Sequence, residues 1–232
     1  MLKPTLIAGA IVAAVLAVAA PARAKIIEIG RADGTPACPT SPCLAVSRTT
    51  GYQIKVADER SSFVVPEDGK IVAWTIALGN PNADQTSFFD KSLGGPASAQ
   101  LTDLRLGKRL FARTITQSPI QRLQPYFGQT VQFPLGRSLN VRKGDILALT
   151  VPTWAPALTT LLTDHSSWRA SRPLAKCNDT SSQTAQMRLG ANAQYRCLYK
   201  ARLTYSATLV TRPVPNPPAP TPTPTPTPTP GP

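Results

Sequence analysis

The only histidine of the chain lies in a stretch that contains the three residue types of a hydrolytic triad. Asp164, His165 and Ser166 are consecutive in "TDHSSW". A triad needs a nucleophile, a base and an orienting acid that converge from different elements, which three consecutive residues cannot do. No G-x-S-x-G nucleophile element occurs elsewhere. We therefore expect no serine-hydrolase chemistry and keep His165 only as a candidate for ligand binding.

Carboxylate chemistry is the next possibility. A glycoside hydrolase needs two carboxylates about 5–10 Å apart with different pKa values. The chain has 12 acidic residues, many in expected turns or loops, such as Glu67, Asp68, Asp145, Asp164 and Asp179. Two of these carboxylates could meet across strands. We predict that the protein is not an enzyme, with a secreted polysaccharide hydrolase as the alternative. Without a D-x-[DN]-x-[DN]-G string or a glycine-rich phosphate loop, we predict neither a metal site nor a cofactor.

Aromatic and basic side chains gather in one polar region. Trp154 in "PTWAP" and Trp168 in "SSWRAS" flank a stretch rich in Thr and Ser, and Arg169 and Arg172 follow closely. Exposed aromatic rings stack on sugars, and guanidinium groups hold acidic substituents. These four residues and His165 are the predicted ligand-binding residues, for a cell-wall or extracellular polysaccharide or another acidic polymer. The alternative is that both tryptophans fill the end of the core.

The four cysteines form two couples. Cys38 and Cys43 lie in "CPTSPC", whereas Cys177 and Cys197 bracket a polar stretch. Proximity favours pairing within each couple among the three possible connectivities, and an oxidising compartment makes these pairs disulfides. A four-thiolate zinc site is the competing interpretation, but the chain lacks two short C-x₂₋₄-C knuckles.

The N-terminus predicts export. Lys3 precedes an apolar segment over residues 6–20, and small residues, Ala22 and Ala24, occupy the positions that a signal peptidase prefers. Residues 1–24 are therefore a predicted signal peptide, with an uncleaved anchor as the alternative. The mature protein would begin at Lys25, be extracellular or on the cell surface, and contain no membrane span.

The charge balance is strongly basic. The chain has 25 basic and 12 acidic residues, a net charge of +13, and residues 25–232 keep 23 of the basic ones. Such a protein is attracted to anionic polymers, although solubility alone is a simpler explanation. No basic run exceeds two residues, so no specific nucleic-acid binding is predicted.

Strand patterns dominate residues 25–212, which predict one domain. Turns at residues 67–69 and 142–144 lead into strands at 70–78 and 145–151. Along residues 203–210 apolar and polar positions alternate, as in a half-buried strand, and Trp74 is expected in the core. These patterns predict an all-β, jelly-roll-like sandwich of about ten strands, with further strands at 52–56, 62–65, 86–89, 100–106, 109–116 and 130–133.

The C-terminus, residues 213–232, alternates Thr and Pro. Proline removes every second backbone donor and fixes φ, so this tail is predicted to be disordered and extended, close to polyproline II.

Two segments, "VVPEDGKIVAWTIALG" and "FGQTVQFPLGRSLNVRKGDILALTVP", resemble uncharacterised secreted β-sandwich proteins of high-GC Gram-positive bacteria. The resemblance implies fold and export and no catalytic residue. Together these features predict an exported binding or structural module of the cell envelope or extracellular space. A hydrolase and a ligand-free structural surface protein are the alternatives, and the sequence does not define an oligomeric state.

Overall fold

The computed structural model describes residues 23–40, 42–160, 165–179 and 183–213. Residues 24–212 form one compact unit. The predicted signal peptide and tail lie outside the described residues, apart from Arg23, Ala24 and Pro213.

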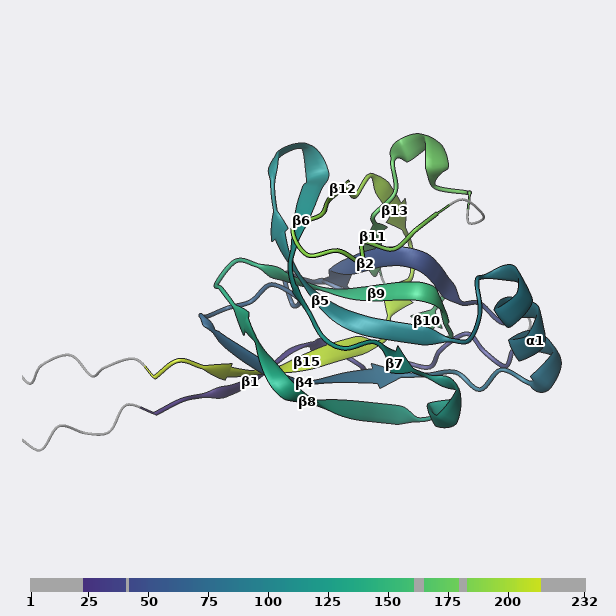
Figure 1. The fold of residues 1–232 in the computed structure, drawn as a ribbon, viewed down its shortest axis with the longest axis horizontal. Helices are drawn as coiled ribbons and strands as arrows, with labels where there is room; N and C mark the ends of the chain where they lie inside the picture. Colours follow the sequence, from purple (N-terminus) through teal and green to yellow (C-terminus); the bar gives the residue numbers. More distant parts are fainter. Residues whose placement is uncertain (1–22, 41, 161–164, 180–182, 214–232) are drawn as a thin grey trace, which may run out of the picture. The chain divides into compact units, whose positions relative to one another are not determined.

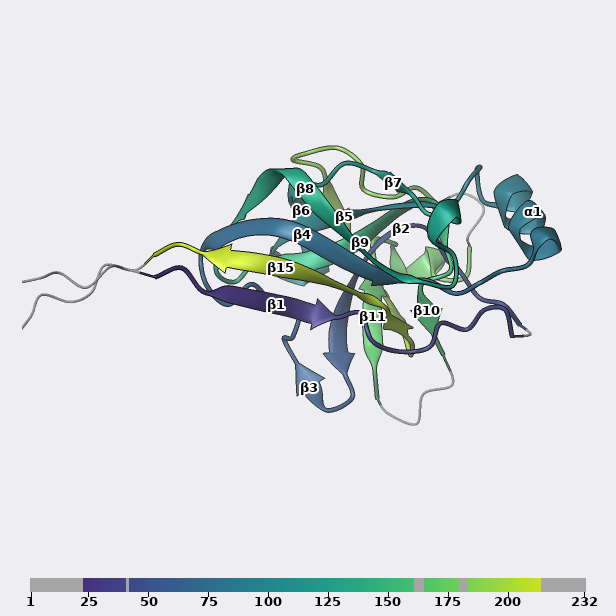
Figure 2. The ribbon, with the colours of Figure 1, turned by 90° about the horizontal axis from the view of Figure 1, so that it is seen from below.

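The body consists of two antiparallel sheets, the lower and upper layers of Figure 1. Figure 2 shows the lower sheet from below, with its four strands side by side. In spatial order they are β1 (Ile26–Arg31), β15 (Tyr205–Thr211), β4 (Gly69–Ala77) and β8 (Thr130–Val141). The upper sheet runs β12 (Asn192–Gln194), β6 (Phe111–Gln117), β5 (Ser98–Leu106), β9 (Ile146–Ala155), β2 (Val46–Val56), β11 (Ser167–Ala170) and β13 (Cys197–Tyr199). Short strands β3 (Glu59–Arg60) and β7 (Gln121–Arg122) join β2 and β5, and β10 (Leu158–Thr159) pairs with β14 (Arg202–Leu203).

The connectivity is that of a jelly roll. Eight of the described strands have six or more residues: β1, β2, β4, β5, β6, β8, β9 and β15. When these eight strands are numbered 1 to 8 along the chain, their spatial order is 1-8-3-6 in the lower sheet and 5-4-7-2 in the upper sheet. The chain therefore passes repeatedly between two packed sheets, as in a double Greek key. The predicted all-β sandwich is confirmed.

Two predicted strands are wrong. Residues 62–65 form a turn with one isolated bridge, between Val64 and Ile146. Residues 86–89 belong to a helix, α1 (Ala83–Ser92), at one end of the sandwich (Figures 1 and 2). The Asn82 side chain accepts a hydrogen bond from the backbone of Gln85, whose side chain accepts one from the backbone of Asn82, each at 2.9 Å. This capping box starts a helix despite the β-propensity of the Phe88–Phe89 pair. The other helical turns are η1 (Lys108–Leu110), η2 (Gln124–Tyr126) and η3 (Leu174–Lys176).

The core lies between the two sheets. Trp74 of β4 is fully buried, as predicted, and its ring centroid lies 5.0 Å from that of Phe133. The alternation predicted for residues 203–210 places Leu203, Tyr205, Ala207 and Leu209 inside. The Tyr205 hydroxyl crosses the core and donates to the Leu147 carbonyl oxygen at 2.9 Å, which ties the sheets together.

The outer face of the upper sheet carries a buried threonine ladder. The hydroxyl oxygen of Thr150 lies 2.9 Å from that of Thr50 and 2.6 Å from that of Thr102, across three strands. A covering segment, defined as residues 183–195, closes over the ladder. Its Gln186 is buried and donates to the backbone of β6, and Tyr195 donates to Gln186 at 2.6 Å. This layer shields polar groups that the strand pattern alone would place in water.

Both predicted disulfides are confirmed. Cys38 pairs with Cys43, and Cys177 pairs with Cys197. The second bond joins Cys177, which precedes the covering segment, to Cys197 of β13, which follows it.

Replacing Cys177 and Cys197 by alanine is expected to lower the free energy of unfolding by about 3 kcal/mol, because the bond closes a loop with a sequence separation of 20 residues. The matched control is the Cys38→Ala, Cys43→Ala variant, whose separation of 5 residues predicts about 2 kcal/mol. Urea unfolding of both variants measures the difference, and a larger loss in the control would contradict the prediction.

Candidate functional site

The predicted aromatic surface around Trp154 and Trp168 is corrected by the structure, which buries both rings. Trp154 is 0 % exposed and packs against Phe89 and Phe127, with centroid distances of 4.8 and 5.6 Å. Trp168 is 4 % exposed and stacks on Tyr199 at 4.7 Å. A Cβ at Gly51 would lie 2.6 Å from the Trp168 ring, so this glycine lets the indole lie flat on β2. Both rings support the fold and offer no stacking face.

The three other predicted binding residues are not gathered into one site. Arg172 is buried and donates to the Ser47 carbonyl oxygen at 2.7 Å and to the Tyr199 hydroxyl at 3.0 Å. Arg169 donates to the Tyr195 carbonyl oxygen at 3.2 Å. His165 is exposed just before β11 and lines none of the four cavities whose walls are described. Both arginines therefore act as cross-links between elements.

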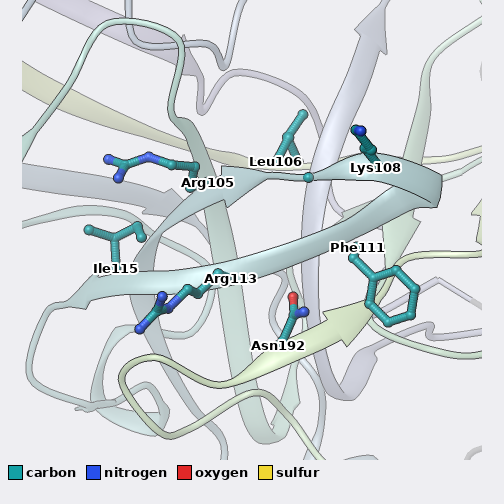
Figure 3. Close-up of a pocket in the computed structure, with 8 residues that line it drawn as sticks. Arg105, Leu106, Lys108, Phe111, Arg113, Ile115 and Asn192 are labelled. Carbon is teal, nitrogen blue, oxygen red and sulfur yellow. The ribbon is translucent and has the colours of Figure 1, made fainter.

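A different group of side chains forms a concave, positively charged surface, which we call the cationic pocket. It lies on the β5–β6 hairpin, which projects from the upper sheet (Figure 1). Its volume is about 440 Å³, and Figure 3 shows the side chains that line it. They are Arg105, Leu106, Lys108, Phe111, Arg113, Ile115 and Asn192, together with Gly107.

Strand register explains why these cations face one another. Arg105 of β5 is paired directly with Arg113 of β6, and Arg113 with Asn192 of β12. Three neighbouring strands therefore contribute an Arg, Arg, Asn row to the same face. Figure 3 shows the two guanidinium groups extending to the same side. Like charges directly opposite each other destabilise a sheet, and an ion pair of Arg105 with Asp145 offsets part of this repulsion.

The charges in the row are compensated unequally. Arg105 makes a bidentate ion pair with the buried Asp145, with both N–O distances at 2.8 Å. The side chains of Lys108 and Arg113 form no hydrogen bond or ion pair with any described residue. Two exposed cations are thus available, beside a Phe111 ring that is 39 % exposed.

Asp103, two residues before Arg105, is the most perturbed carboxyl group beneath this surface. It is fully buried, and neither oxygen has a hydrogen-bond partner. Its pKa is raised to about 8, first by burial and then by the nearby Asp145 carboxylate, with Arg105 opposing the shift. Asp103 is therefore largely protonated at neutral pH. Both carboxyl groups lie beneath the sheet surface and line none of the four cavities.

The hairpin tip is strained. Arg109 and Leu110 have φ values of 54° and 62°, in the left-handed region that side chains other than glycine rarely adopt. Such residues cost about 1–3 kcal/mol each and are concentrated at functional sites. The Leu110 carbonyl oxygen accepts a 2.8 Å hydrogen bond from the Tyr195 backbone, and the Arg109 carbonyl oxygen accepts one from Gln194. The covering segment thus holds the tip in the shape that forms the pocket.

Three further cavities have described walls. One of about 640 Å³ lies between β6 and β8, and two others, of about 610 and 330 Å³, lie beside α1. None of the four brings two carboxylates together. No cluster of three metal-ligating side chains occurs in the described part of the chain. Among the same residues, no helix has the length and apolarity needed to span a membrane.

The cationic pocket was missed from the sequence, although a signal was present. Four of the nine residues from 105 to 113 are basic. A search for uninterrupted basic runs does not find them, because in a strand the residues of one face alternate along the sequence.

Fold and site define a jelly-roll sandwich with an exposed cationic pocket on a projecting hairpin. Comparison with known proteins found no match: no family model fits the sequence, and neither a curated protein nor a solved structure is significantly similar. The geometry and charge of the site therefore carry the proposal of function.

Proposed function

We propose that the protein is an exported module that binds an acidic polymer through the cationic pocket. The observation that carries the proposal is the pair of uncompensated cations, Lys108 and Arg113, beside the exposed Phe111 ring on a projecting hairpin. Guanidinium and ammonium groups bind carboxylates, and an adjacent ring covers the apolar face of a sugar. The excess of 23 basic over 12 acidic residues in residues 25–232 attracts such a polymer over longer distances.

Export is part of the same proposal. The N-terminal sequence predicts a signal peptide, and two disulfides are compatible with an oxidising compartment outside the cytoplasm. Membership of the secreted β-sandwich proteins that the sequence resembles also stays a prediction.

The two alternatives have less support. A polysaccharide hydrolase would be favoured by two facing carboxylates, and the coupled pair Asp103 and Asp145 is buried beneath the surface. A ligand-free surface protein would be expected to have a smooth body without an exposed aromatic ring. The hairpin instead forms a concave surface at some cost in strain and charge repulsion.

Replacing Lys108 and Arg113 by alanine is expected to weaken binding to polygalacturonate about tenfold. Exposed charge contacts contribute roughly 0.5–1 kcal/mol each, and 1.4 kcal/mol corresponds to a factor of ten. Titration calorimetry with purified protein at low salt measures the affinity. Binding should also weaken as salt is added, because exposed charges are screened.

The matched control is Lys70→Ala with Lys200→Ala, which removes the same net charge from exposed positions outside the cationic pocket. If the control loses as much affinity as the pocket variant, only net charge matters and the pocket is not the site. If wild-type protein does not bind polygalacturonate, the proposal in this form fails.

A further inference from the structure

The cavity between β6 and β8, which we call the polar pocket, adjoins the cationic pocket. It is lined by residues 115–119, residues 137–140 of β8 and Leu189, and has a volume of about 640 Å³. Ile115 lines both cavities. The two therefore meet along β6, which at about 3.4 Å per residue is roughly 20 Å long. This is a path for an extended ligand rather than for a single small anion.

The chemistry of the two cavities differs. The polar pocket contains one exposed cation, Arg137, with Ser138 and Asn140 beside it. The side chains of these three residues make no hydrogen bond or ion pair with any described residue. Hydroxyl and amide groups both donate and accept, which suits neutral hydroxyls of a ligand better than a dense row of negative charges.

Apolar side chains complete the polar pocket. Leu189 is 65 % exposed, and Leu139 and Ile115 add further aliphatic surface. A combination of apolar walls and a few placed polar groups is typical of small-molecule and sugar sites. A ligand that fills both cavities must carry negative charge in the cationic pocket, hydroxyl groups in the polar pocket and weakly apolar faces.

We propose that the two cavities form one groove for an acidic polysaccharide chain, with carboxylates in the cationic pocket and neighbouring sugar hydroxyls in the polar pocket. This inference rests on the proposed function and specifies its ligand class. A short oligomer occupies the cationic pocket alone, whereas a longer one also contacts β8.

The test compares galacturonate trimer and dodecamer, with polyphosphate of similar charge as a polyanion that lacks sugar hydroxyls. In the Ser138→Ala, Asn140→Ala variant, which leaves the net charge unchanged, dodecamer affinity is expected to fall about tenfold because two hydrogen-bonding groups are lost. Trimer and polyphosphate affinities should stay within twofold of wild type. Gln132→Ala removes an exposed amide from the same strand outside the groove. It is the matched control and should leave the affinities for all three ligands unchanged.

The failures of the two proposals are distinguishable. If the Lys108→Ala, Arg113→Ala variant weakens binding but the Ser138→Ala, Asn140→Ala variant does not, the groove is overturned and the cationic pocket stands. If neither variant weakens binding, both proposals are overturned. If polyphosphate binds wild-type protein more tightly than the dodecamer, the assignment to an acidic polysaccharide is overturned. Circular dichroism of each variant establishes that it is folded.

Discussion

Replacing Trp154 by alanine is expected to lower the free energy of unfolding by about 3–5 kcal/mol while leaving polygalacturonate affinity unchanged. The indole is fully enclosed, and its N–H donates to the Asp90 carboxylate at 2.8 Å, which anchors α1 to the end of β9. Alanine would leave a cavity beside Phe89 and Phe127 and remove the hydrogen-bond partner of Asp90. Urea unfolding and calorimetric titration at 15 °C measure the two quantities.

Trp154→Phe is the control that separates packing from hydrogen bonding. It keeps most of the buried ring and removes the N–H. We therefore expect Trp154→Phe to lower the free energy of unfolding by about 1–2 kcal/mol. A Trp154→Ala protein that kept wild-type stability but lost affinity would show that the indole contacts the ligand, which would contradict its buried position.

Raising the pH from 5 to 8 is expected to reduce the free energy of unfolding by roughly 3–4 kcal/mol through Asp103 alone. Its pKa is about 8 in the folded protein and has an ordinary value of 3.8. Between these pH values the folded state holds a proton that the unfolded state has released. The contribution of Asp103 to the free energy of unfolding is therefore largest at low pH and falls as the pH rises. The slope is about 1.4 kcal/mol per pH unit for one proton.

Asp33 acts in a different pH range. Burial raises its pKa, but hydrogen bonds from Arg202 and Arg31 outweigh this effect, so the net pKa is lowered. Its contribution to stability is lost only as the pH falls through the acidic range below 4. The interval from pH 5 to 8 therefore reports on Asp103 without interference from Asp33.

Asp103→Asn is expected to remove most of this pH dependence. The amide is neutral at all pH values and has nearly the shape of a protonated carboxyl group. Denaturant unfolding at pH 5, 6, 7 and 8 should give a flatter profile for the variant than for the wild type. Asp58→Asn, at a fully exposed side chain, is the control and should keep the wild-type slope. Parallel profiles for wild type and Asp103→Asn would contradict the assignment.

Much of the fold was predictable because it depends on local patterns. Alternating apolar residues predicted β15 and its buried face, tight turns predicted the starts of β4 and β9, and close spacing predicted both disulfides. The helix α1 was missed because its capping box depends on two polar side chains, whereas the adjacent phenylalanines favour a strand. Its packing on Trp154 is a tertiary contact that no local pattern contains.

The position of the candidate site was not predicted. Basic and aromatic side chains around Trp154 and Trp168 were expected to bind an acidic polymer, but the structure buries both rings. The sequence by itself determined most of the strand segments, the excess of positive charge and the pairing of cysteines, because each depends on composition or near neighbours. Only the tertiary structure decided which tryptophans are enclosed, that Arg105, Arg113 and Asn192 share one row, and that the cationic and polar pockets meet at Ile115. The physical reason is that strand register brings Arg105 and Asn192 into one row although they are 87 positions apart. An exposed surface depends on such long-range pairings rather than on the periodicity of any one strand.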